Sequence, residues 1–442
     1  IYLSDGPAGL RIEPKREDDD QTYYCTAFPI ATLLSSTWNV DLNESVGKAM
    51  GNEALEYGID VILGPGANMM RHPLCGRNFE YYSEDPILTG IIGAAMVNGI
   101  ESNGVGTSVK HFVANNQESN RNFNDVIVSE RALREIYLKG FEIIVKKSQP
   151  WTVMSSYNLV NGTYVSQSRE LLTNVLRGDW GFKGLVMTDW FGGQNAPKQI
   201  SAGNDLLEPG TKIQWKALKE AVEKGDLAIE DVDISVKRIL KLILESRKME
   251  SYPFSNKPDL KAHAEIARQS AAEGMILLKN EHALPFQNVK NIALLGVTSY
   301  DFIAGGTGSG DVNEAYTVSL GEGLKNAGYE INELAQNAFD EHKAANKKLF
   351  VKPEGFSAMI EPYDPPELLL NPEQLKQIAA SSDIGIITIG RNSGEGADRV
   401  EKDDFLLSEE ENDMITNTCE AFHQVGKKVI VVLNIGGVIE TA

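Results

Sequence analysis

Gly184-Leu185-Val186-Met187-Thr188-Asp189-Trp190 is the segment around which the rest of the chain is organised. Its apolar part is short and rich in β-forming residues, which is typical of a parallel strand buried on both faces. The run ends in a carboxylate and an indole, followed by Phe191-Gly192-Gly193. In a β/α barrel, the loops after the strands converge on one open face that carries the chemistry. Asp189 is therefore either a functional carboxylate at a barrel mouth or the N-cap of the next helix.

On both sides of this strand, short apolar strands alternate with amphipathic helices from residue 1 to about residue 245. Strands are expected at Ile1–Ser4, Val61–Leu63, Thr107–Phe112, Thr152–Ser156, Leu185–Thr188 and Asp205–Leu207, with a seventh considered near Ala31–Ser35. Helices are expected at Asn43–Tyr57, Pro86–Ser102, Glu130–Lys147 and Arg169–Trp180. Such alternation predicts parallel strands joined by helical crossovers. The predicted fold class is α/β, with a (β/α) barrel over residues 1–245 whose closure the visible strands do not demonstrate.

A second α/β domain is predicted after the barrel. The helix expected at Ile234–Ser246 ends the first unit, and residues 246–262 have the polar, proline-bearing composition of a linker. Residues 263–442 then carry a helix at His263–Leu277 and three strands. The strands are Ile292–Gly296, Asp383–Gly390 and Lys428–Leu433. Residues 336–372 are polar, contain several prolines and lack clear periodicity, so a long excursion or inserted subdomain is expected there.

Composition excludes several classes of function. The 442 residues are 42% apolar and 24% charged, and 42 Lys+Arg against 62 Asp+Glu give a net charge of −20. Such an acidic surface repels phosphate backbones and anionic lipid, so no nucleic-acid or membrane partner is expected. Cys25, Cys75 and Cys419 are odd in number and far apart, and the six histidines form no HExxH pair. Neither a disulfide framework nor a metal site is predicted, and no cofactor is expected.

The two ends of the sequence suggest that it is a fragment. It begins within a predicted strand at Ile1-Tyr2-Leu3, without a methionine or a signal peptide, and stops soon after a buried strand at Lys428–Leu433. The localisation is therefore unknown, and both a cytoplasmic and a secreted bacterial location stay open. The acidic insertion and a truncated edge favour self-association, and a homodimer is the assembly considered.

Polar side chains follow the predicted strands at the ends from which the loops leave. In chain order they are Asp5-Gly6-Pro7 with Arg11, Gly64-Pro65-Gly66 with Arg71 and Arg77, Lys110-His111, Ser155-Ser156-Tyr157-Asn158 and Asp189-Trp190. Any one of these groups is explained equally well by a salt bridge or a cap. Five groups at the same strand ends instead predict a barrel mouth able to hydrogen-bond hydroxyls.

Two loops of the second domain carry further candidates. Arg391–Arg399 follows a predicted strand, and glycines on both sides of Glu395 indicate a mobile loop that could carry a carboxyl group across a domain cleft. The alternative is an exposed turn in which Asp398 and Arg399 join a surface ion network. Gly305–Gly310 resembles the start of a phosphate-binding loop, but Asp311 stands where the third glycine belongs. A flexible turn is the favoured interpretation of that run.

These motifs resemble those of glycoside hydrolase family 3, of the β-glucosidase type. The most recognisable is GPGANMMRHPLCGRNFEYYSEDP at residues 64–86. The others are Ser4–Pro7 with Arg11, Lys110–Phe112 followed by Asn115–Glu118, Met154–Asn158, Trp180–Gly184 and Thr188–Trp190. Ala272–Asn280 resembles the family's entry into an α/β sandwich domain, so the resemblance covers nearly the whole chain. It implies a TIM-like (β/α) barrel followed by that sandwich.

The resemblance also implies a function and a set of site residues. It implies a retaining, exo-acting β-glucosidase that removes terminal glucosyl residues from a small oligosaccharide or β-glucoside by way of a covalent intermediate. Asp189 is the implied nucleophile, and Glu395 on the sandwich domain is the implied acid/base. The implied walls of the sugar pocket are Asp5, Arg11, Arg77, Lys110, His111, Met154, Tyr157 and Trp190. Thr188 stands where the family usually has serine, and the chain ends before the sandwich normally finishes.

Other functions stay open or are disfavoured on particular residues. β-Xylosidase and α-arabinofuranosidase activities use the same machinery, and a catalytically silent sugar-binding fragment is a further alternative. The family's N-acetylglucosaminidases usually carry a KHFPG motif, whereas Lys110–Phe112 continues here as Val113-Ala114-Asn115. A nucleotide-binding oxidoreductase is disfavoured because the Gly305–Gly310 run does not complete its motif.

Overall fold

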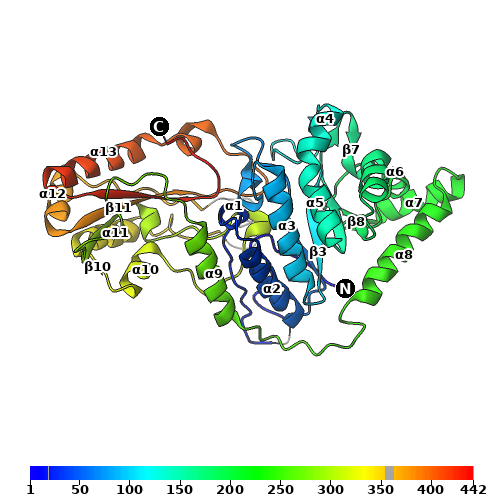
Figure 1. The fold of residues 1–442 in the computed structure, drawn as a ribbon, viewed down its shortest axis with the longest axis horizontal. Helices are drawn as coiled ribbons and strands as arrows, with labels where there is room; N and C mark the ends of the chain where they lie inside the picture. Colours follow the sequence, from blue (N-terminus) through cyan, green and yellow to red (C-terminus); the bar gives the residue numbers. More distant parts are fainter. Residues whose placement is uncertain (18, 354–362, 442) are drawn as a thin grey trace. The chain divides into compact units, whose positions relative to one another are not determined.

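The computed structural model of the chain (Figure 1) describes residues 1–17, 19–353 and 363–441. The chain divides into two compact units. Unit 1 is Ile1–Met275 with Ser309–Glu314, and unit 2 is Ile276–Gly308 with Ala315–Ala442. Helix α9 (Leu260–Gly274) packs against helices α1 and α2 and so belongs to unit 1. The division therefore falls after the segment proposed as a linker, residues 246–262, and the predicted domain boundaries stay a prediction.

Unit 1 is built on a parallel five-stranded sheet. Its strands, in sheet order, are β1 (Leu3–Asp5), β2 (Val61–Leu63), β3 (Gly106–Phe112), β5 (Thr152–Ser155) and β8 (Leu185–Thr188). All four neighbouring pairs are parallel, and Ser155 lies opposite Thr188 at the ends of the last pair. The sixth predicted strand contributes a single parallel bridge, Met187 to Leu206. The α/β class and the parallel barrel-like architecture are confirmed.

Helices and a small second sheet complete unit 1. The helices are α1 (Ala31–Ser36), α2 (Val40–Glu56), α3 (Pro86–Glu101), α4 (Glu130–Ala132), α5 (Lys139–Ser148), α6 (Ala196–Ala202), α7 (Lys212–Lys224) and α8 (Ile229–Glu245). Wider or tighter helical turns are η1 (Gly76–Glu80), η2 (Leu133–Tyr137), η3 (Val165–Gln167) and η4 (Glu170–Asp179). The second sheet joins β4 (Asp125–Val126), β6 (Leu159–Val160) and β7 (Thr163–Tyr164).

The seventh strand considered near Ala31–Ser35 is wrong, because that stretch forms helix α1. Its buried positions, Ala31, Leu34 and Ser35, are spaced as one face of a helix rather than alternating as in a strand. The Ser36 hydroxyl also donates to the Thr32 carbonyl at 2.9 Å, one turn earlier. The single helix predicted at Glu130–Lys147 consists of three consecutive segments, α4, η2 and α5.

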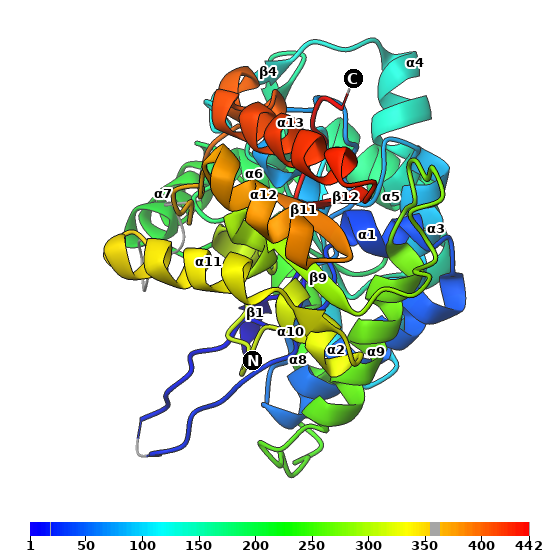
Figure 2. The ribbon, with the colours of Figure 1, turned by 90° about the vertical axis from the view of Figure 1, so that its left-hand side faces the viewer.

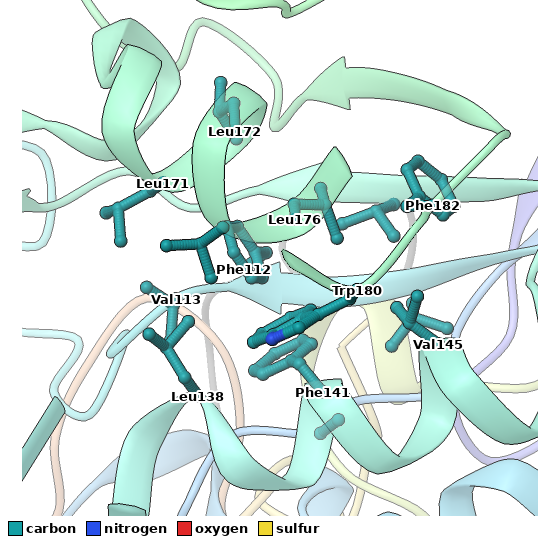
Figure 3. Close-up of a cluster of buried hydrophobic side chains, with 14 of the residues drawn as sticks. Phe112, Val113, Leu138, Phe141, Val145, Leu171, Leu172, Leu176, Trp180 and Phe182 are labelled. Carbon is teal, nitrogen blue, oxygen red and sulfur yellow. The ribbon is translucent and has the colours of Figure 1, made fainter. Parts of the chain in front are cut away.

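An aromatic cluster in unit 1 supports the end of strand β3 (Figure 3). The Phe112 ring meets those of Phe141 and Trp180 edge-on, with centroids 5.4 Å and 6.0 Å apart. Phe112 and Phe141 are fully buried, and each such ring removes a large apolar area from water. Because Phe112 directly follows Lys110 and His111, the cluster fixes the part of the chain that presents these two polar side chains.

Unit 2 is a four-stranded parallel sheet with helices on both faces. The sheet order is β10 (Glu330–Ile331), β9 (Asn291–Leu295), β11 (Ile384–Arg391) and β12 (Val429–Ile435). One face packs against α11 (Glu333–Ala345), α12 (Pro372–Ser381) and α13 (Glu409–Gln424), as Figure 2 shows. Residues of α10 (Leu320–Asn326) pack against the other face. The three predicted strands are confirmed, and the second α/β domain is present.

Two expectations for this part of the chain are wrong. Residues 336–345, at the start of the supposed excursion, belong to α11, which buries Ala335 and Phe339 against the sheet. Residues 354–362 of the same stretch lie outside the described residues. The helix predicted to reach Leu277 ends at Gly274, and Met275 is extended. The apolar run Ile276–Leu278 that prolonged the predicted helix is exposed and not helical.

The described residues contain neither a membrane-spanning helix nor a metal-binding cluster. No helix there is both long and apolar enough to cross a bilayer. Within the same ranges, no group of three or more His, Cys, Asp and Glu side chains is placed to hold a metal ion.

Candidate active site

Asp189 stands directly after β8 and is only 7% exposed. Its backbone N–H donates to the Ser155 carbonyl at 3.0 Å, which continues the ladder between β5 and β8 by one residue. The Trp190 N–H donates to Asp189 Oδ1 at 2.8 Å and so fixes the carboxylate. The next helix, α6, is capped by Asn195, whose side chain accepts from Lys198 N–H. Asp189 is therefore not the N-cap, which was the structural alternative.

His111 lies against this carboxylate. Its Nε2 atom is 3.6 Å from Asp189 Oδ2, and its side chain is fully buried at the end of β3. Burial lowers the pKa of His111 well below its usual value, and the positive charges of Arg77, Lys110 and Arg121 lower it further. The imidazole is consequently neutral at physiological pH, with one ring nitrogen protonated and the other an acceptor.

Two buried side chains hold His111 in place. Asn68 Oδ1 accepts the His111 backbone N–H at 2.7 Å, and Asn68 Nδ2 donates to the His111 carbonyl at 2.9 Å. The Tyr81 hydroxyl lies 3.3 Å from His111 Nδ1. Burial raises the pKa of Tyr81 well above its usual value, so the phenol keeps its proton.

Arg77 and Lys110 share one carboxylate, that of Glu80. Glu80 Oε1 accepts from Arg77 Nε, and Glu80 Oε2 lies 3.8 Å from Lys110 Nζ. The three side chains are each exposed by 2% or less, so their charges depend on one another for compensation. Arg77 Nη2 also donates to Ser309 Oγ at 3.3 Å. Glu80 and Ser309 were not among the predicted site residues.

The ring of Tyr157, which follows β5, makes a cation–π contact with Arg121. The guanidinium carbon of Arg121 lies 4.4 Å from the centre of the Tyr157 ring, and Arg121 Nη1 pairs with Glu118 Oε2 at 2.6 Å. Tyr157 is 6% exposed. Arg121 and Glu118 were missed as well, because the loop between β3 and β4 carries no strand-end signal. Met154 lies within β5 and is buried in a cluster against which Trp190 packs.

Asp5 and Arg11 close a turn at the end of β1. Arg11 N–H donates to the Asp5 carbonyl at 2.8 Å, and the Ser4 hydroxyl donates to the Arg11 carbonyl. The two side chains are half-buried, whereas Arg71 is exposed.

Among the predicted site residues, the structure brings together His111 with Asp189, and Arg77 with Lys110 through Glu80.

Glu395 lies in unit 2, in the loop that follows β11. The loop is anchored at both ends by arginines. Arg391 Nη2 pairs with Glu411 Oε2 at 2.6 Å, and Arg399 Nη2 pairs with Asp404 Oδ1 at 2.7 Å. Arg399 is only 7% exposed, so the ion network considered for this loop is a buried one.

Sequence comparison identifies known relatives of both units. The Glycosyl hydrolase family 3 N terminal domain matches residues 20–242, and the Glycosyl hydrolase family 3 C-terminal domain matches residues 275–442. Thermostable beta-glucosidase B of Acetivibrio thermocellus is 38% identical over 450 residues, which cover 100% of this chain and 56% of that protein. An exo-alpha-(1->6)-L-arabinopyranosidase of Bifidobacterium longum is 34% identical over 457 residues, with the same two shares.

Solved structures agree with these matches. Beta-glucosidase 3B from Thermotoga neapolitana, in complex with glucose, superimposes with a TM-score of 0.95 at 49% identity. The match covers 99% of this chain and 62% of that one. The chain thus spans a little over half the length of the relatives it matches.

Proposed function

Because this chain belongs to glycoside hydrolase family 3, we propose that it is a retaining, exo-acting β-glucosidase. The observation that carries this proposal is the buried carboxylate of Asp189 at the end of a parallel strand, beside a neutral His111 at 3.6 Å. In parallel β/α folds the carboxyl ends of the strands are where catalytic groups lie. The substrate proposed is a β-glucoside or small oligosaccharide with a terminal glucosyl residue.

Asp189 is the proposed nucleophile. Its carboxylate attacks the anomeric carbon, the bond to the leaving oxygen breaks, and a covalent glycosyl ester forms with inversion. Water then attacks the same carbon from the opposite side, so the ester bond breaks and the product retains its β configuration. The Trp190 N–H on Oδ1 holds the carboxylate in one orientation, which lowers the entropic cost of reaching the attacking geometry.

Glu395 is the proposed acid/base. In the first step its carboxylic acid gives a proton to the leaving oxygen, and in the second its carboxylate takes one from the attacking water. Its place on a loop after a parallel strand of unit 2 agrees with this role. The proposal also needs a protonated carboxyl in the resting enzyme.

The sugar pocket is proposed to consist of the charged and aromatic groups at the strand ends of unit 1, together with Met154 of β5. Its members are Asp5, Arg11, Arg77, Lys110, His111, Met154, Tyr157 and Trp190. Charged side chains make the stronger hydrogen bonds to hydroxyl groups, and an indole ring covers the apolar face of a pyranose. A neutral His111 adds a donor or an acceptor without adding charge.

A second candidate is an arabinosidase or xylosidase activity at the same site. Relatives named exo-alpha-(1->6)-L-arabinopyranosidase match 100% of the chain at 34% and 35% identity.

A homodimer is also proposed, and its test is the mass in solution by light scattering.

One set of rates tests the function. The purified chain is assayed on 4-nitrophenyl β-glucoside, β-xyloside, α-arabinofuranoside, α-arabinopyranoside and N-acetyl-β-glucosaminide, beside Asp189→Ala. Glucoside turnover that the variant loses supports the proposal. A fluorinated glucoside that leaves its sugar bound to the Asp189 peptide would identify the nucleophile directly. Glucose binding without turnover of any glycoside would instead support a silent sugar-binding protein.

A further inference from the structure

We propose that the glycine-rich segment Gly305–Gly308 of unit 2 positions Glu395, with Thr307 and Gly308 as its positioning residues. This inference rests on the proposed acid/base role of Glu395 and extends that role to two residues outside the predicted site. The sequence of the segment suggests a defective nucleotide loop or a flexible turn. Its contacts within unit 2 fit neither of them.

The backbone of Thr307 is bonded to both sides of the loop residue Gly394. Thr307 N–H donates to the Ser393 carbonyl at 3.0 Å, and Glu395 N–H donates to the Thr307 carbonyl at 3.2 Å. Together they form an isolated parallel bridge between Thr307 and Gly394. Paired hydrogen bonds of this kind fix the register of two extended segments. The peptide group that enters Glu395 is therefore held by Thr307.

Two glycines make this approach close enough. A Cβ atom at Gly394 would lie 2.6 Å from the Thr307 carbonyl oxygen, which is far inside van der Waals contact. A Cβ atom at Gly308 would lie 2.6 Å from Glu395 Cβ and 3.2 Å from Glu395 Oε2. Gly308 also has a φ of +86°, a conformation that residues with a side chain rarely adopt. The Glu395 side chain thus lies directly against the bare face of Gly308.

The rest of the loop explains why such a brace is needed. Arg391 and Arg399 anchor its two ends through Glu411 and Asp404. Glu395 lies midway between them, four residues from each anchor, and has glycine on both sides. Glycines leave the backbone free to take many conformations. The bridge to Thr307 removes that freedom at the residue whose position matters for proton transfer.

A displaced acid/base has a recognisable kinetic signature. Protonation of the leaving oxygen matters most for an alkoxide or sugar leaving group, and little for a dinitrophenolate that departs unaided. Gly308→Ala is therefore expected to lower kcat/KM about tenfold or more on cellobiose, and by less than about threefold on 2,4-dinitrophenyl β-glucoside. A merely destabilised protein would lose activity equally on both substrates.

Gly328→Ala is the matched control. Gly328 is also in unit 2, has a φ of +92° and has open space where a Cβ atom would lie. It carries the same backbone strain without contacting Glu395, so its two substrate rates should fall together or not at all. Gly394→Ala, on the other side of the bridge, should reproduce the selective loss of Gly308→Ala. Equal losses on both substrates in the Gly308 and Gly394 variants would overturn the positioning role.

Glu395→Ala separates this inference from the proposed function. If that variant shows no dependence on the leaving group, the acid/base assignment itself fails. If it shows the dependence and the Gly308 and Gly394 variants do not, only the positioning role fails. Hydrogen exchange in the unmodified protein tests the bridge even if both variants misfold. Protected Glu395 and Thr307 amides support it, and exchange at the rates of an unfolded peptide overturns it.

Discussion

His111 Nε2 and Asp189 Oδ2 lie 3.6 Å apart, and the two side chains are almost completely buried. Because burial and three nearby cations keep the imidazole neutral, the pair is not an ion pair. A lone pair on Nε2 would repel the carboxylate, so the tautomer with a proton on Nε2 is favoured there. Nδ1 is then the unprotonated ring nitrogen and accepts a hydrogen bond. The orientation of the residues around it decides which group donates that bond.

The Tyr81 hydroxyl is expected to be that donor. Asn68 Oδ1 also lies 3.4 Å from Nδ1, but an amide oxygen cannot donate, and the Asn68 amide nitrogen donates to the His111 carbonyl instead. Tyr81→Phe should therefore lower kcat/KM roughly twofold to tenfold, the cost of one hydrogen bond. It should also shift the His111 ring toward the other tautomer, which ¹⁵N spectra of histidine-labelled protein report directly. Tyr82→Phe, at the adjacent buried tyrosine, should change neither quantity. An unchanged His111 spectrum in Tyr81→Phe would refute this assignment.

Removing the Asp189 carboxylate should abolish turnover. Asp189→Ala is expected to lower kcat by about a thousandfold or more, because the covalent route is closed when the nucleophile is absent. The melting temperature should change little beside this loss. Asp226→Asn, at an exposed carboxylate in the turn after α7, should leave kcat unchanged. Retention of more than a tenth of the wild-type kcat by Asp189→Ala would rule Asp189 out as the nucleophile.

Glu80 should matter for stability as well as for sugar binding. Glu80→Gln leaves Arg77 and Lys110 as two buried cations without a shared carboxylate. Breaking a buried ion pair from one side costs about 3–5 kcal/mol of unfolding free energy. Glu44→Gln removes an exposed partner of Lys48 instead and should cost less than about 1 kcal/mol. Urea titrations of the two variants measure this difference, and equal midpoints would contradict it.

Glu101 should make stability depend on pH. Burial raises its pKa from 4.5 to about 7, although Thr107 and the Trp151 N–H donate hydrogen bonds to it. The folded state then binds the proton more tightly than the unfolded state. The stabilisation that this tighter proton binding adds to the unfolding free energy is fully present below pH 4.5. It falls as pH rises toward 7, and the unfolding free energy no longer changes through Glu101 above that. The unfolding free energy lost over this range is up to about 3 kcal/mol, because a tenfold change in proton affinity corresponds to roughly 1.4 kcal/mol.

Glu101→Gln tests this dependence, because the amide oxygen keeps the acceptor of those hydrogen bonds and removes the charge. The variant should be more stable than the parent at pH 8 and lose the slope between pH 4.5 and 7. Glu223→Gln, at an exposed position of α7, is the control and should keep that slope. Urea unfolding across this pH range measures it. A parallel pH profile in Glu101→Gln and the parent would count against the prediction.

Much of the fold could be predicted because buried parallel strands have a strong sequence signal. Val61–Leu63 and Leu185–Thr188 are observed with the predicted bounds, since each is a short apolar run buried throughout. β10 was missed because two residues with one exposed side chain carry no such pattern. The apolar run after Gly274 extended the predicted helix, yet composition alone does not show where a helix ends.

Part of the candidate site could likewise be predicted from the sequence, and part of it could not. His111 and Asp189 were found because both stand at the ends of apolar strands, and the structure places them in contact. Glu80 was missed because its partner Arg77 precedes it by three residues on a single helical turn. A glutamate at that spacing is usually an exposed ion pair, and only the surrounding fold buries it. The bridge from Thr307 to Gly394 joins residues far apart in sequence, which no local pattern reports.

The sheet of unit 1 has a consequence for how the protein is made. Its order, β1-β2-β3-β5-β8, follows the order of synthesis, so each strand emerging from the ribosome can pair with an edge that already exists. Of these five strands, the one that carries Asp189 is added last. The groups proposed to hold the sugar at the earlier strand ends are therefore synthesised before the proposed nucleophile. A chain halted before β8 would contain the proposed sugar-binding groups of the earlier strands and lack the proposed nucleophile.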